Sequence, residues 1–469
     1  MMVNKVIVCP ICGKKTLLRI QDGGYLNEYP IRVNCYNCRA LLKGTFIMNP
    51  HSPYRGLFML NADIEECDID IDADTLTCKN ADYVAEVSGE LPCDFVKEYR
   101  GGPLVSPFLK TTDYLDSVED YINRLTYFNN NIEEWKKKKS TAFQLLDDGS
   151  IEYISTALNN KMGEYSYVCD NYLKSIHCLQ EVVLEETKNL FFEPKQDEYV
   201  KKIIQEMSSI ECEMLDQFAN RLGGVQKLIQ SYRKTIEVFS RFMTIYSNIL
   251  PAETYMNFKN KDGANTCIAT CSFTDIKTFY QDAYESLLSL MYIPVCLDNI
   301  DIRRDYQSFD VTYENVRCPK NRRRDFDWYK ELDNGTRINK LNGRERFQGL
   351  VDFPADRQLR NGIGHNNIEY DSIKQIIIAY DLKHPKKINY KGNLMSVAIT
   401  CLKLAKSTVV FSEIILFMLR REFKREGKHS IMHPRFYVGT QPNDKCPCGS
   451  GLKYKKCCQR DVDIVRRSK

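Results

Sequence analysis

Two tight clusters of cysteine, one near each end of the chain, constrain the fold of this sequence more than any other feature. The first cluster has the pattern C-x2-C, a spacer of 22 residues and C-x2-C, and the second has the pattern C-x-C-x8-C-C. Two thiolates on one tight turn can point at a single ion, and a second pair completes the tetrahedron that zinc prefers. The sequence therefore predicts two structural zinc ions per chain. Their ligands are Cys9, Cys12, Cys35, Cys38, Cys446, Cys448, Cys457 and Cys458.

The compartment decides between metal binding and disulfides. The sequence shows no N-terminal apolar segment with a cleavage site, so we expect a soluble protein of the cytoplasm with no membrane partner. Thiols stay reduced there, which favours metal binding in the two clusters. The other eleven of the 19 cysteines are scattered among apolar residues, and about four in five of them are expected to pack in cores.

The N-terminal cluster, in VIVCPICGKKT and VNCYNCRA, resembles a zinc ribbon over residues 1–50. Gly13 directly follows the first cysteine pair and provides backbone freedom for the turn. Ribbons of this kind are often purely structural because they hold together a segment that is too small to fold alone. The resemblance also allows binding of nucleic acids or proteins.

The C-terminal cluster lies in NDKCPCGSGLKYKKCCQ and resembles the SEC-C motif over residues 440–461. The resemblance implies one zinc ion; the family often has histidine as its last ligand, where this chain has Cys458. A closed site with four protein ligands leaves no position for a reacting water, so the motif favours docking to a protein or ribosome partner. We expect a linker over residues 437–444 to make this tail modular. The lysines expected to offset the thiolate charge are Lys453, Lys455 and Lys456.

The patterns between the two ends predict a mainly α, multidomain protein. Residues 51–112 alternate like strands, and residues 113–260 carry helical apolar stripes, such as the one from Val200 to Phe218. Residues 261–436 form a further helical region. Within it, NIEYDSIKQIIIAYDL predicts a hairpin, and a long amphipathic helix is expected from Leu394 to Phe423.

The stretch RQLRNGIGH, residues 357–365, combines Arg360, Asn361 and His365. Residues four apart share a helix face, so Asn361 and His365 can lie together while Arg360 is displaced. The glycines at 362 and 364 predict a helix end or distorted turn with backbone close to another element.

These residues resemble the R-N-x3-H motif of HEPN ribonucleases, which are helical domains. The resemblance implies a metal-independent endoribonuclease in which His365 moves protons, Arg360 holds the phosphate and Asn361 orients the phosphate or the histidine. It also implies a homodimer, because two facing copies would bring both histidines into one cleft. Prokaryotic stress or phage-defence roles, with cleavage of tRNA or mRNA, are further expectations from the family.

Other interpretations of this stretch stay open. Arg360 could pair with a carboxylate such as Asp356 while His365 caps a helix end. The protein would then be a non-catalytic, zinc-dependent adaptor or nucleic-acid-binding protein. A ribosome- or secretion-associated factor docked by the SEC-C tail is a third possibility.

The charge of the chain requires local patches for RNA binding. With 66 basic and 62 acidic residues, the net charge of +4 attracts nucleic acid only weakly. The best patch combines Arg322, Arg323 and Arg324 with Trp328, since guanidinium groups bind phosphates and aromatic rings stack on bases. An exposed charged loop is the alternative.

Overall fold

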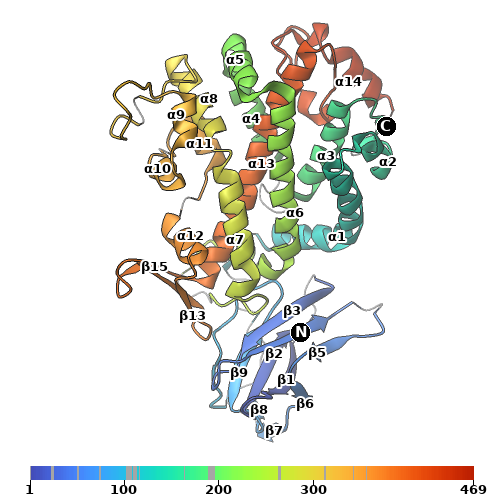
Figure 1. Cartoon of the computed structure of the whole chain (residues 1–469). Helices are drawn as coiled ribbons and strands as arrows, with labels where there is room; N and C mark the ends of the chain where they lie inside the picture. The colour runs from blue at the N-terminus through green and yellow to red at the C-terminus, as the bar shows by residue number, and fades with distance from the viewer. Residues whose placement is uncertain are drawn as a thin grey trace. The chain divides into compact units, whose positions relative to one another are not determined.

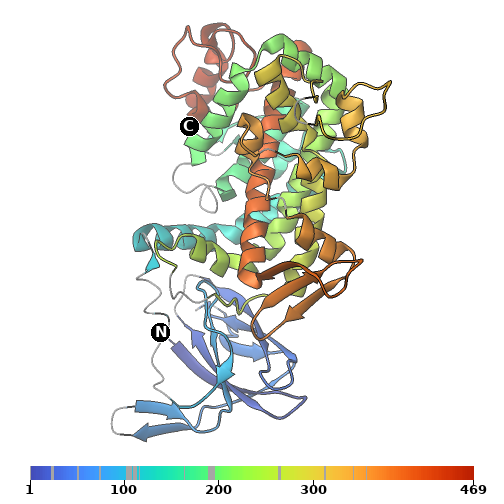
Figure 2. The same ribbon diagram turned by 90° about the vertical axis from the view of Figure 1, so that its left-hand side faces the viewer.

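The computed structural model describes residues 2–22, 26–49, 52–72, 75–101, 108, 114–115, 117–162, 164–187, 196–261, 266–310, 313–341, 343–354 and 356–468. The chain is mainly helical with a small β-rich region at its N-terminus (Figures 1 and 2), which confirms the predicted fold class. It divides into two compact units, each assembled from three separate stretches. Unit 1 comprises Met1–Asn130, Arg241–Gln281 and Gln358–Leu402, and unit 2 comprises Asn131–Ser240, Asp282–Arg357 and Lys403–Lys469.

Six antiparallel strand pairs and one parallel pair build the described N-terminal β region of unit 1. A five-stranded sheet has the order β10-β9-β2-β1-β6, in which β2 and β9 run parallel. A three-stranded sheet has the order β3-β4-β5, and β7 pairs with β8. The strands are β1 Met2–Val8, β2 Lys15–Gln21, β3 Glu28–Asn34, β4 Leu41–Ile47, β5 Gly56–Met59, β6 Asp63–Glu65, β7 Ile69–Asp72, β8 Thr75–Cys78, β9 Tyr83–Val87 and β10 Lys97–Glu98.

The predicted zinc ribbon and the predicted β-rich segment share these sheets. Strands before residue 50 pair with strands after it in β1–β6, β2–β9 and β4–β5. The predicted boundaries at 50/51 and 112/113 lie outside the described residues. The division of the chain into five consecutive segments therefore stays a prediction. Each of the two compact units contains parts of several of these segments.

The segment from residue 266 to residue 272 ties the β region to the rest of unit 1. The Arg32 N–H donates to the Ala269 carbonyl at 2.7 Å, and Cys93 and Cys267 exchange backbone hydrogen bonds of 2.9 and 3.1 Å. On its other side, the Gln375 side chain bonds both backbone groups of Ile268 at 2.8 and 3.0 Å. Backbone bonding of this kind makes the β region an integral part of the unit.

The remaining part of unit 1 contains the hairpin predicted after residue 367. It has a third strand, so that β13 Ile368–Asp371, β14 Ile376–Tyr380 and β15 Ile388–Asn393 form an antiparallel sheet. Helix α12, Arg357–Gly364, lies against this sheet in both views (Figures 1 and 2). Unit 1 also holds the beginnings of α1 Val118–Asp147, α7 Phe273–Leu288 and the end of α6 Gly224–Met256.

Unit 2 is helical around a core of apolar and aromatic side chains. The predicted stripe in residues 200–218 is buried at Val200, Ile203, Met207 and Phe218. Its helices include α2 Ile154–Ala157, α3 Tyr172–Thr187, α4 Gln196–Ser209, α5 Cys212–Leu222, α8 Tyr292–Arg303, α9 Phe326–Glu331, α10 Asn334–Asn339, α11 Arg346–Val351 and α14 Gln459–Arg466. A small two-stranded sheet, β11 Lys161–Met162 and β12 Tyr165–Ser166, completes it.

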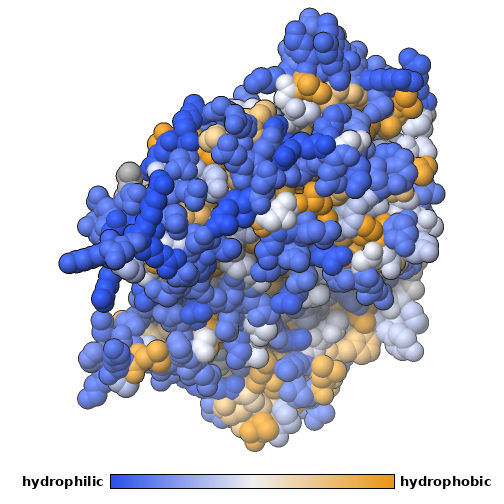
Figure 3. Space-filling view, turned by 45° about the horizontal axis from the view of Figure 1, so that its top comes forward, coloured by the Kyte–Doolittle hydropathy of each residue, from blue (hydrophilic) through white to orange (hydrophobic). Residues whose placement is uncertain are grey.

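The long helix predicted from Leu394 is present as α13, Leu394–Arg425. Within the described part of the chain it is the one helix long and apolar enough to cross a membrane, but 72% of its most apolar stretch is buried inside the protein. This burial is typical of a core helix. The face shown in Figure 3 is mainly hydrophilic, with hydrophobic residues in small groups.

Candidate metal centres and the Arg-Asn-His turn

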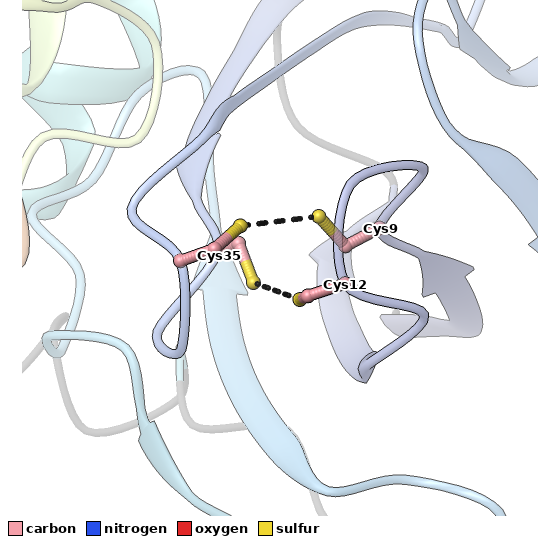
Figure 4. A group of neighbouring side chains, drawn as sticks. Cys9, Cys12 and Cys35 are labelled. Carbon is pink, nitrogen blue, oxygen red and sulfur yellow. Dashed lines mark hydrogen bonds between the residues drawn. The ribbon is translucent and has the colours of Figure 1, made fainter.

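The N-terminal cysteines converge from two loops, one after β1 and one after β3 (Figure 4). The Sγ atoms of Cys9 and Cys38 are 3.5 Å apart, and those of Cys12 and Cys35 are 3.6 Å apart. All four sulfurs lie within 4.8 Å of one another. A zinc tetrahedron with Zn–S bonds of about 2.3 Å has edges of about 3.8 Å, so this donor set fits zinc.

Both loops of the N-terminal site use the same turn. In the first, the N–H of Gly13 donates to the Cys9 carbonyl at 2.9 Å; in the second, the N–H of Arg39 donates to the Cys35 carbonyl at 2.8 Å. The residue after the second cysteine has a φ of 68° at Gly13 and 64° at Arg39. Glycine adopts this left-handed conformation without steric cost, whereas arginine adopts it at a cost in free energy. Arg39 also bonds Asp371 at 3.1 Å.

One ligand of this site is prepared for metal binding by local hydrogen bonds. The backbone N–H of Lys14 and the side chain of Asn37 lower the pKa of Cys12 to about 6. The thiolate is the form that binds zinc, so these donors favour the ligating state at neutral pH.

The C-terminal cysteines form the second cluster with a similar geometry. The Sγ atoms of Cys448 and Cys457 are 3.5 Å apart, and those of Cys457 and Cys458 are 3.7 Å apart. All four sulfurs, including that of Cys446, again lie within 4.8 Å of one another. Ser450 Oγ lies 3.2 Å from Cys457 Sγ and can donate to it. This cluster also fits a zinc ion.

Residues 438–444, in the segment expected to be a linker, are exposed or half-buried, but the SEC-C motif that follows them is not a free tail. Tyr437 is 1% exposed and stacks on Tyr454 of the motif, with ring centroids 5.6 Å apart. Arg421 of α13 donates to the Gly449 carbonyl at 2.9 Å and forms an ion pair with Asp216 of α5. The motif is thus packed into the helical core of unit 2.

A buried arginine accompanies this second cluster. Arg420 is 4% exposed, and its Nε and Nη2 atoms have no hydrogen-bond partner among the described residues. Its guanidinium lies over the Phe417 ring, 5.6 Å from the centroid, and a side chain added at Gly449 would collide with that same ring. Burial lowers the pKa of Arg420. The negative charge of nearby groups opposes this shift, and these groups are Glu413, Tyr437, Cys448 and Cys458. The lysines predicted to offset the thiolate charge, Lys453, Lys455 and Lys456, are exposed.

The Arg-Asn-His stretch forms the end of α12 and the turn after it. Arg360 Nη1 donates to Asn361 Oδ1 at 2.9 Å, and both side chains are half-buried. His365 directly follows the helix; its backbone N–H donates to the Asn361 carbonyl at 3.0 Å, and its side chain is exposed. The structure thus brings Arg360 and Asn361 into contact and places His365 one turn further on, at the surface.

The glycine that interrupts this stretch has a packing role. A side chain at Gly362 would collide with the methyl group of Ala379 in β14. The N–H of Asn367 donates to the Gly362 carbonyl at 2.9 Å, so the chain reverses directly into β13. The predicted close approach of backbone to another element is therefore present at Gly362.

The predicted RNA-binding residues are placed differently from the expected patch. Arg322 forms a bidentate pair with Glu331 at 2.6 and 2.8 Å, Arg323 lies 3.5 Å from Asp305, and Arg324 lies 3.6 Å from Asp310. Trp328 is 3% exposed and packs edge-on against Tyr313. A buried ring cannot stack on a base, so this geometry does not support a role for Trp328, while RNA binding stays a prediction.

Comparison with known proteins gives a family match over the C-terminal motif and partial matches to curated proteins. Residues 443–460 match the SEC-C motif. A stretch of 125 residues is 33% identical to the protein translocase subunit SecA of Syntrophomonas wolfei. The match covers 25% of this chain and 13% of that protein. No solved structure matches the chain. These findings support zinc binding at the C-terminal cluster.

Sequence reasoning missed the two arginines at the end of α13. The available signal was the charged pair in FMLRREF, which interrupts the apolar pattern of a long helix at Arg420 and Arg421. Arg421 links the motif to α5, and Arg420 brings a buried cation next to it. Neither role could be assigned without knowing that the C-terminal motif packs on this helix.

Proposed function

We propose that the chain is a metal-independent endoribonuclease of the HEPN type that acts as a homodimer. The observation that supports it best is the exposure of His365 beside a joined Arg360–Asn361 pair. An exposed imidazole is accessible to RNA, as a proton-transfer group must be.

The proposed reaction uses the ribose 2′-OH as nucleophile. Its oxygen attacks the adjacent phosphorus, the bond to the 5′-oxygen breaks, and the products are a 2′,3′-cyclic phosphate and a 5′-hydroxyl. His365 moves the proton of the nucleophile or delivers one to the leaving oxygen, since imidazole titrates near neutral pH. Arg360 binds the phosphate and stabilises its charge in the transition state.

Asn361 has a positioning role in this scheme. Its Oδ1 accepts the hydrogen bond from Arg360, which fixes the orientation of the guanidinium. Its Nδ2 group can then donate to a phosphate oxygen. The asparagine would thus hold the arginine and the phosphate in one geometry.

A second copy of the chain would complete the site. One copy supplies a single histidine, whereas in-line cleavage uses one group to take a proton and another to deliver one. An isologous contact presents the same patch twice, and the exposed end of α12 is available for it. The two zinc ions are structural in this proposal, because both donor sets are closed.

The decisive experiment is RNA cleavage by purified protein during a short exposure to EDTA that leaves the structural zinc bound. The wild type should cut RNA, leave cyclic or 3′-phosphate ends and spare DNA, which lacks the nucleophile. His365→Ala should lose about 10²- to 10⁴-fold in rate, and Arg360→Ala should impair both binding and rate. Gln358→Ala, an exposed change on the same helix, is the matched control. Equal rates for folded His365→Ala and wild type would overturn the proposal.

Growth after induction tests the proposed biological role in stress or phage defence. The wild-type protein should halt growth by cutting tRNA or mRNA, and His365→Ala should not. Equal toxicity of the two proteins would remove that role.

The SEC-C match favours a second candidate, a zinc-dependent adaptor that docks to a protein or ribosome partner without catalysis. Copurification with ribosomes that is lost in a variant of the exposed Lys453, Lys455 and Lys456 would support it. Cleavage that depends on His365 without such copurification would argue against it.

A further inference from the structure

The loop between β14 and β15 carries a concentrated positive charge. Residues 382–391 read LKHPKKINYK, with four lysines, one histidine and no acidic residue. Every residue from Leu382 to Ile388 is exposed. Three of the lysines, Lys383, Lys386 and Lys387, lie in the turn itself, which we call the basic tip.

The basic tip has a defined conformation. Asp381 Oδ1 accepts hydrogen bonds from the backbone N–H groups of Lys383 and His384, each at 2.9 Å. Its other oxygen accepts from Asn389 Nδ2 at 3.1 Å, and the Asp381 N–H donates to the Lys387 carbonyl at 2.8 Å. A carboxylate that is used in this way shapes the turn while the lysine side chains extend outward. Hydrogen bonds from Asn389 and the turn N–H groups lower the pKa of Asp381, so the cap stays ionised at neutral pH.

The lysines of the basic tip have no carboxylate partner among the described residues, which distinguishes them from the arginines that the sequence suggested as an RNA-binding patch. Arg322, Arg323 and Arg324 each lie within 4.0 Å of an acidic side chain. A neighbouring carboxylate offsets the charge of a paired arginine and repels a phosphate, whereas phosphate binding to an unpaired lysine releases only solvent and small ions. The unpaired tip is therefore the better phosphate-binding surface.

The basic tip also begins beside the Arg-Asn-His turn. Asn367, two residues after His365, accepts the N–H of Tyr380 at 3.2 Å and donates from Nδ2 to the Tyr380 carbonyl at 2.9 Å. Tyr380 directly precedes Asp381. The close approach of Gly362 to Ala379 fixes α12 on the same end of β14. One hydrogen-bonded substructure thus carries both His365 and the lysines.

We propose that the basic tip binds the phosphate backbone of single-stranded RNA and leads it to His365. This inference rests on the proposed nuclease function and names how that site holds its substrate. Lysine binds phosphate as a point charge without reading sequence, so the tip would supply affinity and position. Lys391 is not part of the tip, because it lies within β15, paired with Ile378 of β14.

Binding is tested apart from cleavage. All proteins carry His365→Ala, and fluorescence anisotropy follows a labelled, uncut, single-stranded RNA over a salt series. Changing Lys383, Lys386 and Lys387 to Gln should weaken binding roughly 10- to 100-fold at low salt and reduce the salt slope by about 2, as expected for three phosphate contacts on a single strand. The matched control changes three exposed lysines of unit 2, Lys201, Lys202 and Lys227, to Gln, and should bind as the parent does.

The outcomes separate this inference from the nuclease proposal. Equal RNA affinity and salt slope in the tip variant and the parent would overturn it, even if the wild type cuts RNA. Weaker binding in the tip variant would support RNA binding by the tip, even if no cleavage were found. Binding of the tip to vesicles of anionic phospholipid, with no change in RNA affinity on substitution, would identify a membrane surface instead and also overturn it. A circular dichroism spectrum that matches the parent shows that the variant is folded.

Discussion

The two four-cysteine clusters have nearly the same sulfur geometry but differ in what surrounds them. The N-terminal site lies between two loops of a β region, where Cys12 and Cys38 are half-buried. The C-terminal site lies against α13, with three of its four cysteines buried and the buried Arg420 nearby. A metal site therefore contributes to different structures depending on its packing: the first closes local turns, and the second joins a C-terminal motif to a helical core.

The largest effect should come from removing the C-terminal zinc. Changing Cys446 and Cys448 to Ser should release one ion and lower the melting temperature of unit 2 on the order of 10 °C, because structural zinc contributes directly to folding. Calorimetry together with zinc analysis measures both quantities. Changing Cys9 and Cys12 to Ser should release the other ion and leave the unit 2 transition in place. An unchanged unit 2 transition in the first variant would restore the modular tail predicted from the sequence.

The second largest effect should come from Arg420. Its replacement by Met removes the buried cation near four thiolates, and zinc affinity at that site should fall about 10- to 100-fold, as for other groups that support metal ligands. Lys456→Met removes an exposed charge near the same cluster and should change little, because water screens it. Competition with a chromophoric chelator measures the two affinities. Equal losses in both variants would mean that burial of the cation is unimportant.

The same contrast shows what could be predicted from sequence. Ligand spacing is local, so eight cysteines and the hairpin at residues 368–380 could be assigned from patterns, and both sulfur clusters and the hairpin are confirmed. Packing partners that lie further along the chain could not be assigned from patterns. Tyr437 and Trp328 were both expected at the surface, yet each is buried. Their ring partners, Tyr454 and Tyr313, lie outside the local sequence pattern. The proposed roles of Arg360, Asn361 and His365 stay predictions.

The third effect is a loss of stability in acid that should be seen in the unfolding of unit 2. His177 of α3 is buried, and its Nδ1 lies 2.8 Å from the Ile431 carbonyl, in the segment that leads to the C-terminal site. Burial, together with nearby Arg420 and His429, lowers the pKa of His177 well below its usual value. The unfolded chain therefore binds this proton more readily. Unit 2 should lose stability as the pH falls below about 6.5, by up to about 1.4 kcal/mol per pH unit.

Substitution of the histidine isolates this contribution. His177→Gln cannot titrate, so its melting temperature should fall less than that of wild type between pH 7 and about pH 5.5, at the same zinc concentration. Parallel curves for the two proteins would assign the acid sensitivity to other groups, such as the zinc thiolates.

The smallest effect concerns the two equivalent turns of the N-terminal site. Gly13 occupies the left-handed position in one loop at no steric cost, but Arg39 holds the same conformation in the other, which costs about 1 kcal/mol for a residue with a side chain. Arg39→Gly removes that strain and also removes the exposed ion pair with Asp371, whose contribution is small. Greater flexibility of glycine in the unfolded chain opposes the gain. We expect a net stabilisation of unit 1 of at most about 0.5 kcal/mol.

The control is Arg39→Ala, which keeps the strain and loses the pair. It should be slightly less stable than wild type in urea unfolding. A Gly variant less stable than the Ala variant would show that the flexibility of glycine in the unfolded chain outweighs the backbone strain relieved at this position.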